Sequence, residues 1–494
     1  MTSPSTWEYR PPAGVGVREG PGDRYLVVLG VVLVGYALMG RGFAYLGAPP
    51  LFIGEVVLAA GLALLLFARR LPPLVLGPAM WMLLPLMAWV GVRTAMGVGT
   101  YGVDAIRDAM IVGYALFAFI VAGLLMQRPE RLRELLVRYR ILAVVILSTA
   151  WAVYLAFRLS PESIPALPWT DKARMIENKP GDLLVHLAGI TAFLILGFKR
   201  ATPLWLVLLV IGTATMMAGN RGGMLGYMLA MVVFAVMKPR SARFGRLAYV
   251  GIFLLLLGLA APSSVKINEG SRTISVDQVW ENVQSVFGKS DSEALNTTTE
   301  WRLLWWKKIV GYTFGGPYLL DGKGFGINLA TDDGFRVDKE NSLRSPHNAH
   351  LTLLARGGVP AFVLWLLVQA LWVREVLLAW ARARRAGQTE WVGVLAMCMV
   401  YWVAAQINGT FDVYLEGPMG GIWFWVVFGV AMAATRLQQT HPHLLDGLRV
   451  GTTSDPRPPS APRWSVATGA RPPLPGAGPR TPTWSPLHAP PASS

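Results

Sequence analysis

Long apolar runs separated by short polar segments make up most of the chain. The runs are residues 25–44, 50–68, 74–95, 109–127, 140–158, 182–198, 202–218, 222–237, 247–262, 350–373, 390–408 and 417–434. A run of about 17–25 apolar residues is long enough to cross roughly 30 Å of hydrocarbon as a helix, the conformer that satisfies the backbone there. The pattern therefore predicts an all-α polytopic membrane protein with about twelve transmembrane helices. The runs 182–198 and 222–237 are short, so each is also a candidate half-helix or interfacial helix.

The amino-acid composition supports this interpretation. Of the 494 residues, 53% are hydrophobic and 15% are charged, and the mean hydropathy is +0.44. Soluble domains contain roughly 25% charged residues. Because the apolar residues are clustered in long runs, the composition favours one helical membrane bundle over several soluble domains.

Basic residues are concentrated in every second loop between the apolar runs. They are Arg69, Arg70, Arg128, Arg131, Arg133, Arg138, Arg140, Lys199, Arg200, Lys238, Arg240, Arg243, Arg246, Arg374, Arg382, Arg384 and Arg385. Because cytoplasmic loops carry an excess of Lys and Arg, this alternation predicts that both termini lie in the cytoplasm. The formal net charge of +16 follows largely from this topology, so it does not indicate nucleic-acid binding.

The pattern divides the chain into five parts. Residues 1–24 are a predicted cytoplasmic tail without a cleavable signal peptide, 25–262 hold transmembrane helices one to nine, 263–346 form a large outer loop, and 347–436 hold helices ten to twelve. Residues 437–494 are dense in Pro, Ser, Ala and Arg. Such a composition buries too little apolar area to offset the entropy of ordering, so this tail is predicted to be disordered.

The large loop contains two stretches with apolar residues at helical spacing. The first comprises Val276, Val279, Trp280, Val283, Val286 and Phe287, and the second comprises Trp301, Leu304, Trp305 and Ile309. This spacing gives each helix one apolar face, and Trp favours the membrane interface. We expect these helices to lie on the membrane surface or to cap a cavity.

Two histidines stand where the loop meets the next span. His347, Asn348 and His350 follow Pro346, a residue tolerated in the first turn of a helix because the amides there are unpaired. This predicts a helix that starts at Pro346 and carries both histidines on one face. A neutral imidazole at this position is suited to accept a proton from a hydroxyl group. The alternative is an interfacial histidine that bonds to a neighbouring loop.

Two arginines on the outer side are candidate anion ligands. Arg221 lies in Gly219-Asn220-Arg221-Gly222-Gly223, and Arg302 is followed by Lys307 and Lys308. A guanidinium among glycines can meet an anion together with nearby backbone amides. The alternatives are a tight turn for Arg221 and the solvated face of an amphipathic helix for Arg302.

Metal and phosphate-loop chemistry are weaker alternatives. Asp332-Asp333 offers the oxygen ligands that Mg²⁺ and Mn²⁺ prefer, although adjacent acids in a glycine-containing turn are more often solvated. Gly322-Lys323 lacks the glycine and the Ser or Thr that a phosphate-binding P-loop requires. Cys398 is the single cysteine, so neither an intramolecular disulfide nor a cysteine metal cluster is expected.

Three further ionisable residues lie within or beside predicted spans. Glu55 and His186 fall within predicted spans, where a charged acid costs roughly 2–3 kcal/mol or more. Each either lines a substrate or proton path or forms a buried polar pair. Arg107 precedes a span beside Asp108, so it either pairs locally or reaches a lipid phosphate.

Taken together, the motifs resemble one known family. His347-Asn348 before a helix with Leu353, Leu354 and Gly357 resembles the signature of the O-antigen ligase and O-antigen polymerase superfamily. Two further marks agree. They are Arg221 in a turn of small residues and, in the outer loop, Arg302 with Trp305 or Trp306 before Gly322-Lys323-Gly324-Phe325-Gly326. The resemblance covers about residues 180–436. Arg356 departs from it, because many members carry Glu there, and this affects the inferred acceptor choice.

The resemblance implies a metal-independent glycosyltransferase with a GT-C-like membrane fold, no cofactor and a site in the inner membrane of a bacterium. By matching motif positions, Arg221 and Arg302 would hold the diphosphate of an undecaprenyl-diphosphate-linked glycan donor, and His347 would serve the acceptor hydroxyl as base or by orienting it. Asn348, Lys307, Lys308, His350 and Arg107 are further candidate substrate-binding residues.

The acceptor stays open at this point. It is a glycan, a lipid or a protein, and ligase and polymerase both fit. Other polysaccharide-assembly proteins are candidate partners. A multi-span transporter is the alternative from another class, although we find neither the paired broken helices that transporters often show nor a reason for the large outer loop.

Overall fold

A computed structural model describes residues 20–48, 51–67, 74–170, 173–242, 267–269, 272–274, 293–336 and 343–449. These residues all belong to one compact unit, Met1–Thr452. The predicted helix around Val276–Phe287 and the predicted span 247–262 lie outside the described residues, as does the tail from residue 450.

The described residues are mainly helical. The helices are α1 (Pro21–Met39), α2 (Arg41–Ala44), α3 (Ile53–Leu66), α4 (Pro78–Tyr101), α5 (Val103–Gly113), α6 (Leu116–Gln127), α7 (Glu130–Leu159), α8 (Pro180–Ile195), α9 (Pro203–Gly219), α10 (Arg221–Met237), α13 (Glu293–Phe314), α14 (Leu329–Asp332), α15 (Ala349–Arg385), α16 (Thr389–Phe411) and α17 (Pro418–Thr440), with a 3-10 turn at Pro161–Ser163. Two antiparallel hairpins pair β1 (Gly47–Ala48) with β2 (Leu51–Phe52) and β3 (Ile267–Glu269) with β4 (Arg272–Ile274).

Each predicted span within the described residues coincides with a helix or a bent helix pair, but not all of these helices are full-length spans. Six are long and apolar enough to cross a membrane: α1, α4, α7, α15, α16 and α17. The pair α5 and α6 is bent by 41° and gives up to seven, whereas α3, α8, α9 and α10 are shorter apolar helices. The prediction of a helical membrane protein is thus confirmed, but the count of about twelve full spans is not.

For α3 and α8, the difference arises at the ends of the apolar runs. The run 50–68 includes β2, which belongs to a hairpin. The run 182–198 includes Gly197, whose φ of 77° is one that glycine adopts readily and that ends a helix. Hydropathy detects apolar turn residues as well as apolar helix residues, so these two runs are longer than the helices within them.

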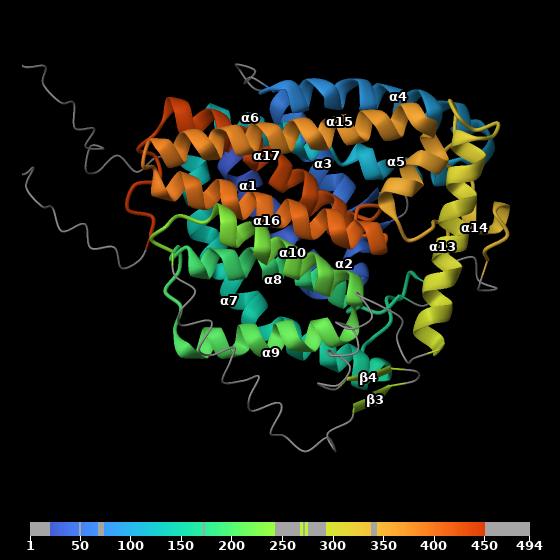
Figure 1. The fold of residues 1–494 in the computed structure, drawn as a ribbon, viewed down its shortest axis with the longest axis horizontal. Coiled ribbons are helices and arrows are strands. Elements are labelled where there is room, and N and C mark those ends of the chain that lie inside the picture. The colour runs from blue at the N-terminus through green and yellow to red at the C-terminus, as the bar shows by residue number, and fades with distance from the viewer. Residues whose placement is uncertain are drawn as a thin grey trace, which may run out of the picture. The chain divides into compact units, whose positions relative to one another are not determined.

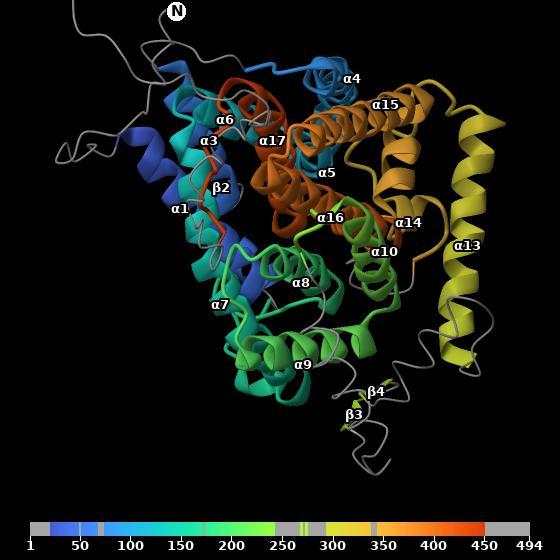
Figure 2. The same ribbon diagram turned by 60° about the vertical axis from the view of Figure 1, so that its left-hand side comes forward.

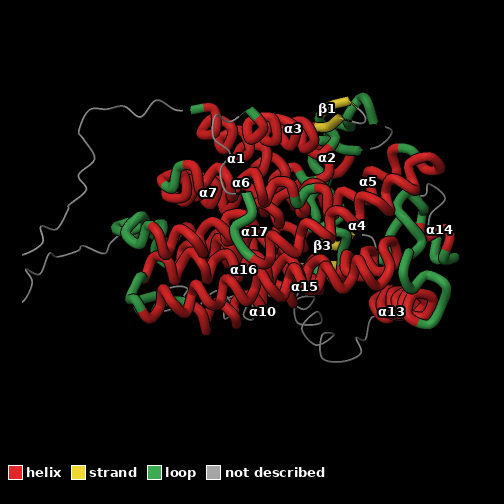
Figure 3. Tube along the Cα trace, turned by 90° about the horizontal axis from the view of Figure 1, so that it is seen from above, coloured by secondary structure: helices red, strands yellow, loops and turns green. Residues whose placement is uncertain are grey.

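Most long helices lie roughly alongside one another, and α13 runs across one end of them (Figure 1). Seen from above, α13 points along the line of sight while α15, α16 and α17 lie in the plane of the picture (Figure 3). The neighbours α8, α10 and α16 pack against each other (Figure 2). The helix predicted around Trp301–Ile309 is therefore confirmed as α13, and it covers helix ends.

Buried tryptophans bind the helices together. Trp372, Trp423 and Trp425 are at most 5% exposed. Their indole N–H groups donate to backbone carbonyls, from Trp372 to Phe428 (3.3 Å), from Trp423 to Leu33 and from Trp425 to Ile111 (both 3.0 Å). A buried indole needs such a partner. Each bond therefore fixes the position of its indole ring, and the ring itself fills the core.

A break in α15 positions the outer loop. Gly358 has φ 69° and ψ −171°, and Pro360 follows it inside the helix. Because proline has no N–H, the carbonyl of Arg356, four residues earlier, loses its helical donor. The amide of Gly324 donates to that carbonyl (2.9 Å), and the amide of Lys323 donates to Ala355 (2.7 Å). The glycine-rich turn of the loop is therefore bonded to the kink.

Candidate active site

The candidate residues converge on the end of α16. This helix ends at Phe411, and Asp412 follows it. Oδ1 of Asp412 accepts from Nζ of Lys179 (2.7 Å) and from the amide of Val413 (2.7 Å), and Nδ1 of His347 lies 3.4 Å away. Burial opposes the charged form of this carboxyl, but Lys179 and then His347 hold the pKa of Asp412 well below its usual range.

Arg302 reaches the same place from α13. Its Nη1 donates to the carbonyl of Phe411 over 3.1 Å. One turn further along, the indole N–H of Trp306 donates to the carbonyl of Pro346 (2.9 Å), directly before His347. The crosswise helix thereby brings Arg302 next to the His347 segment.

Arg221 comes to the site at the start of α10. Asn220 caps this helix by accepting from the amide of Gly223 (2.7 Å). A Cβ at Gly222 would lie 2.6 Å from Cβ of Phe411, and one at Gly223 would lie 2.6 Å from Cα of Gly181. The glycines around Arg221 therefore allow α10 to pack closely on α8 and α16, a role that the sequence does not reveal.

Three helices begin at this site. They are α8 at Pro180, α10 at Arg221 and α15 at Ala349. Each contributes the positive end of its dipole. Together with Lys179, Arg221 and Arg302, they make this end of the bundle suited to an anion.

The local conformation of His347 differs from the prediction. α15 begins at Ala349 and not at Pro346, because Asn348 is the N-cap and accepts from the amides of His350 (3.1 Å) and Leu351 (3.0 Å). His347 precedes the helix with φ 53°, the one positive value at a non-glycine residue among those described. Such backbone strain is concentrated at functional sites.

The prediction that His350 shares a helix face with His347 was wrong, because α15 begins only at Ala349. Its Nδ1 accepts from the indole N–H of Trp365 (3.0 Å), and its Nε2 contacts Thr410 (3.2 Å) and the carbonyl of Gln406 (3.4 Å). Because the indole only donates, Nδ1 carries no proton, and Nε2–H faces α16. Both ring nitrogens thus join α15 to α16.

Lys308 and Arg107, two of the other predicted binding residues, bond to groups other than His347. Lys307 is exposed on α13, and Lys308 donates to the carbonyl of Asp333 (2.7 Å). Arg107 pairs locally with Asp104 (3.2 Å) and Asp108 (3.6 Å). Substrate binding by Asn348, His350, Lys307, Lys308 and Arg107 stays a prediction.

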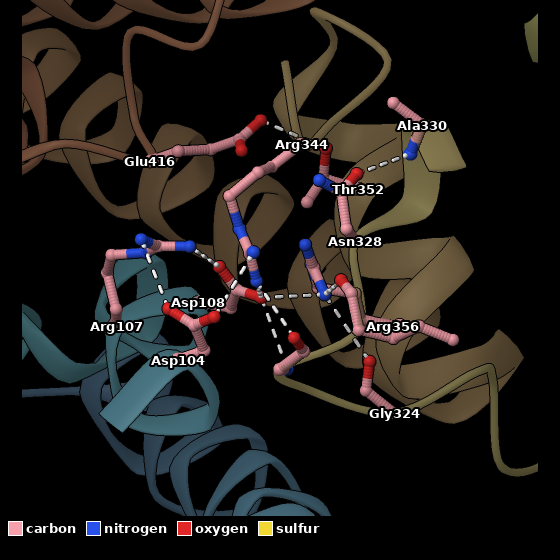
Figure 4. Close-up of polar contacts among 12 residues, drawn as sticks. Asp104, Arg107, Asp108, Gly324, Asn328, Ala330, Arg344, Thr352, Arg356 and Glu416 are labelled. Carbon is pink, nitrogen blue, oxygen red and sulfur yellow. Dashed lines mark hydrogen bonds and ion pairs between the residues drawn. The ribbon is translucent and has the colours of Figure 1, made fainter. Parts of the chain in front are cut away.

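Arg356 belongs to a second polar cluster (Figure 4). Its side chain is 2% exposed and lies 2.9 Å from Asp108 while donating to the carbonyl of Ile327 (2.9 Å). Arg344 donates to Asp104 (3.2 Å), Asp108 (3.1 Å) and Gly326 (2.8 Å). This cluster ties α5 to the outer loop, so Arg356 has a structural partner on each side.

The acids considered for metal binding are engaged with the protein. Lys323 pairs with Asp332 and Asp333, and the indole N–H of Trp305 donates to Asp333 (2.7 Å).

Glu55 and His186, the two ionisable residues within predicted spans, have contacts inside the protein. Glu55 accepts from the hydroxyl of Tyr114 (2.8 Å), which favours the buried-pair interpretation. The ring of His186 packs 4.7 Å from that of Trp423 inside the bundle.

Sequence reasoning missed Lys179, Asp412 and Glu416. Glu416 accepts from the hydroxyl of Thr352 (2.9 Å), and burial raises its pKa, with Ser345, Arg356 and Thr352 partly offsetting that shift. One signal was available, because Asp412 and Glu416 are two acids between the last two spans on the predicted outer side. Their pairing with residues more than 60 positions away left no trace in the sequence.

The helices and this cluster define a membrane protein with a charged polar site where its helices end. A family model described as O-antigen ligase matches residues 205–366. The predicted resemblance to the O-antigen ligase and polymerase superfamily is thus confirmed, and its members are glycosyltransferase-like enzymes of polysaccharide biosynthesis. The matched range includes Arg221, Arg302 and His347. No curated protein matches the chain.

Proposed function

We propose that this protein transfers a glycan from an undecaprenyl-diphosphate-linked donor to an acceptor hydroxyl at the outer face of a bacterial inner membrane. The observation that carries the proposal is the convergence on Phe411 and Asp412 of Lys179, Arg302, His347 and the start of α10 at Arg221. Cations and helix N-termini close to an imidazole suit a reaction with an anionic leaving group.

In this proposal, Arg221 and Arg302 hold the diphosphate. The bond from the anomeric carbon to the diphosphate oxygen breaks, and the electron pair leaves with the diphosphate. Two guanidiniums stabilise the charge that develops on its oxygens. The new bond forms between the anomeric carbon and the acceptor oxygen, so one proton must leave that oxygen.

In this proposal, His347 takes this proton. Asp412 lies on the Nδ1 side of its ring at 3.4 Å. A proton on Nδ1 that faces the carboxylate leaves Nε2 as the basic atom. The carboxylate also stabilises the imidazolium that forms when Nε2 accepts the acceptor proton. No step in this scheme calls on a metal ion.

The proposed topology also has structural support. Basic residues lie near the end of α16 that is away from Phe411, because Arg382, Arg384 and Arg385 are in the last turn of α15, just before α16 begins. Near its start, Trp391 donates to the carbonyl of Pro442 (2.8 Å), and Arg133 donates to the carbonyls of Leu444 (3.3 Å) and Asp446 (2.9 Å). Since basic ends favour the cytoplasm, the site end would face outward.

Gene deletion tests the function and separates its two forms. A ligase predicts loss of glycan attachment with lipid-linked chains accumulating. A polymerase predicts loss of long chains with a single repeat unit still attached. Unchanged surface glycans and unchanged lipid-linked pools would contradict the proposal. Restoration by wild-type protein and failure of His347→Ala to restore would connect the phenotype to this site.

A further inference from the structure

One carboxylate oxygen has three nitrogen neighbours in the candidate site. Oδ1 of Asp412 lies 2.7 Å from the ammonium of Lys179, 2.7 Å from the amide of Val413 and 3.4 Å from Nδ1 of His347. N–H···O bonds are usually 2.7–3.2 Å long. The ammonium and the amide therefore hold this oxygen at full strength, and the imidazole contact is long.

Lys179 occupies the open side of this arrangement. It is the residue before α8, and its side chain is 39% exposed, against 12% for Asp412. Burial works against the ammonium, but Asp412 and Asp182 raise the pKa of Lys179 above its usual value. A lysine ammonium is a compact charge on a flexible stem, so it can exchange one oxygen partner for another without backbone movement.

Lys179 also lies among the elements that carry the proposed donor ligands. Two residues after it, Gly181 packs on Gly223 and Asn220, which flank Arg221. On the other side, Asp412 follows Phe411, whose carbonyl binds Arg302. An anion held by both arginines would thus lie close to the ammonium of Lys179.

We propose that Lys179 is a positioning residue that couples donor binding to His347 by moving its ammonium from Asp412 to a phosphate oxygen of the donor. This inference rests on the proposed function. A diphosphate carries more charge than one carboxylate and attracts the ammonium. Oδ1 of Asp412 then becomes available to the Nδ1–H of His347, which shortens this contact and orients the base. The base is thereby completed when the donor is bound.

Binding of undecaprenyl diphosphate to the full-length protein in nanodiscs provides a test without turnover. We expect Lys179→Met to weaken binding about tenfold or more, since a phosphate contact is lost. Asp412→Asn should bind as tightly as wild type or tighter, because the ammonium no longer has a competing carboxylate. Lys199→Met, at the other end of α8, is the matched control and should not change the affinity.

The double variant Lys179→Met/Asp412→Asn separates direct contact from charge neutralisation. If Lys179 only neutralises Asp412, removing both charges restores wild-type affinity and overturns the proposal. If the ammonium binds phosphate, the double variant stays weak. Arg302→Ala keeps the two hypotheses apart. Normal binding by Arg302→Ala would contradict the proposed donor site itself. Weak binding by Arg302→Ala together with normal binding by Lys179→Met would contradict only the role of Lys179.

The state of His347 gives an independent readout. In protein labelled with ¹⁵N-histidine, the His347 resonances are those missing from His347→Gln. Undecaprenyl diphosphate should shift the Nδ1 resonance in wild type toward that of a stronger hydrogen bond. In Lys179→Met, the resonance should already have the shifted position before addition. A wild-type resonance that does not respond to saturating undecaprenyl diphosphate would overturn the coupling.

Discussion

The indole N–H of Trp365 donates to Nδ1 of His350 over 3.0 Å, so two histidines three residues apart have different tasks. His350 joins α15 to α16 through both ring nitrogens. His347 precedes the helix and faces Asp412. The pair is therefore not redundant, although the sequence predicted both histidines on one helix face.

Substitution of each histidine should change a different property. His350→Ala leaves a buried indole donor unpaired, which costs about 1–3 kcal/mol of stability, while the transfer rate per folded molecule stays within a few-fold of wild type. His347→Ala should lower that rate by about 10²–10⁴-fold, the usual worth of a general base, with little change in stability. Thermal unfolding in detergent and initial rates in proteoliposomes measure the two effects. Equal rate losses in both variants would contradict the assignment.

Cysteine labelling tests the orientation of the site. Cys398 is the single cysteine and is buried, so Cys398→Ser provides a background for new cysteines. In that background, Lys307→Cys on exposed α13 should react with an impermeant thiol reagent in intact cells whose outer barrier is open. Thr389→Cys, at the other end of the bundle, should react only after the inner membrane is permeabilised. The reverse pattern would invert the topology.

The buried pair of Arg356 and Asp108 should contribute to stability more than to donor binding. Removing one partner of such a pair costs about 3–5 kcal/mol because the other charge stays buried. Arg356→Leu should therefore unfold at lower temperature, and Asp108→Asn in the same chain should recover part of the loss. A double-mutant cycle in thermal or denaturant unfolding gives the coupling energy. Additive effects would show that the two side chains do not interact.

Lys179 and Asp412 should give a pH-independent contribution to stability across the neutral range. The pKa of Asp412 is lowered on folding, so its contribution is present above about the usual value of 3.8 and is lost as the pH falls through the folded pKa. The pKa of Lys179 is raised, so its contribution is complete below 10.5 and is lost as the pH rises through the folded pKa.

The measurement compares melting temperatures of His347→Gln/Asp182→Asn with and without Lys179→Met, so that neither the facing imidazole nor the acid beside Lys179 titrates. The difference between the two proteins should stay constant from about pH 5 to pH 10 and shrink outside that window. A difference that changes between pH 6 and pH 9 would indicate that another group governs the pair. Glu416 also faces the site and is the first group to vary in that case.

Local patterns predicted the class of the fold and the main candidate residues. Apolar runs identified the helices, and the arginine and histidine motifs identified three residues that the structure brings to one place. Helix ends were less predictable. Proline is typical of a helix start, which favoured Pro346. Asn348 caps the helix instead, because its side chain accepts from the amides of His350 and Leu351.

Contacts between distant segments were not predictable from a single sequence. Lys179 and Asp412 are 233 positions apart, and each belongs to a short connection with no motif. The glycines around Arg221 suggested an anion-binding turn, whereas Gly222 and Gly223 allow close packing on Phe411 and Gly181. Such roles depend on which elements meet, and no local pattern contains that information.

Initial transfer rates in proteoliposomes, with an undecaprenyl-diphosphate-linked glycan as donor, test the central claim most directly. Arg221→Ala and Arg302→Ala should each abolish most transfer while the protein still inserts and accumulates, and Lys should substitute poorly because it lacks the two-pronged geometry of a guanidinium. Arg384→Ala, at the far end of α15, should transfer at the wild-type rate. Full activity of Arg221→Ala or Arg302→Ala would remove that residue from the donor site and contradict the account.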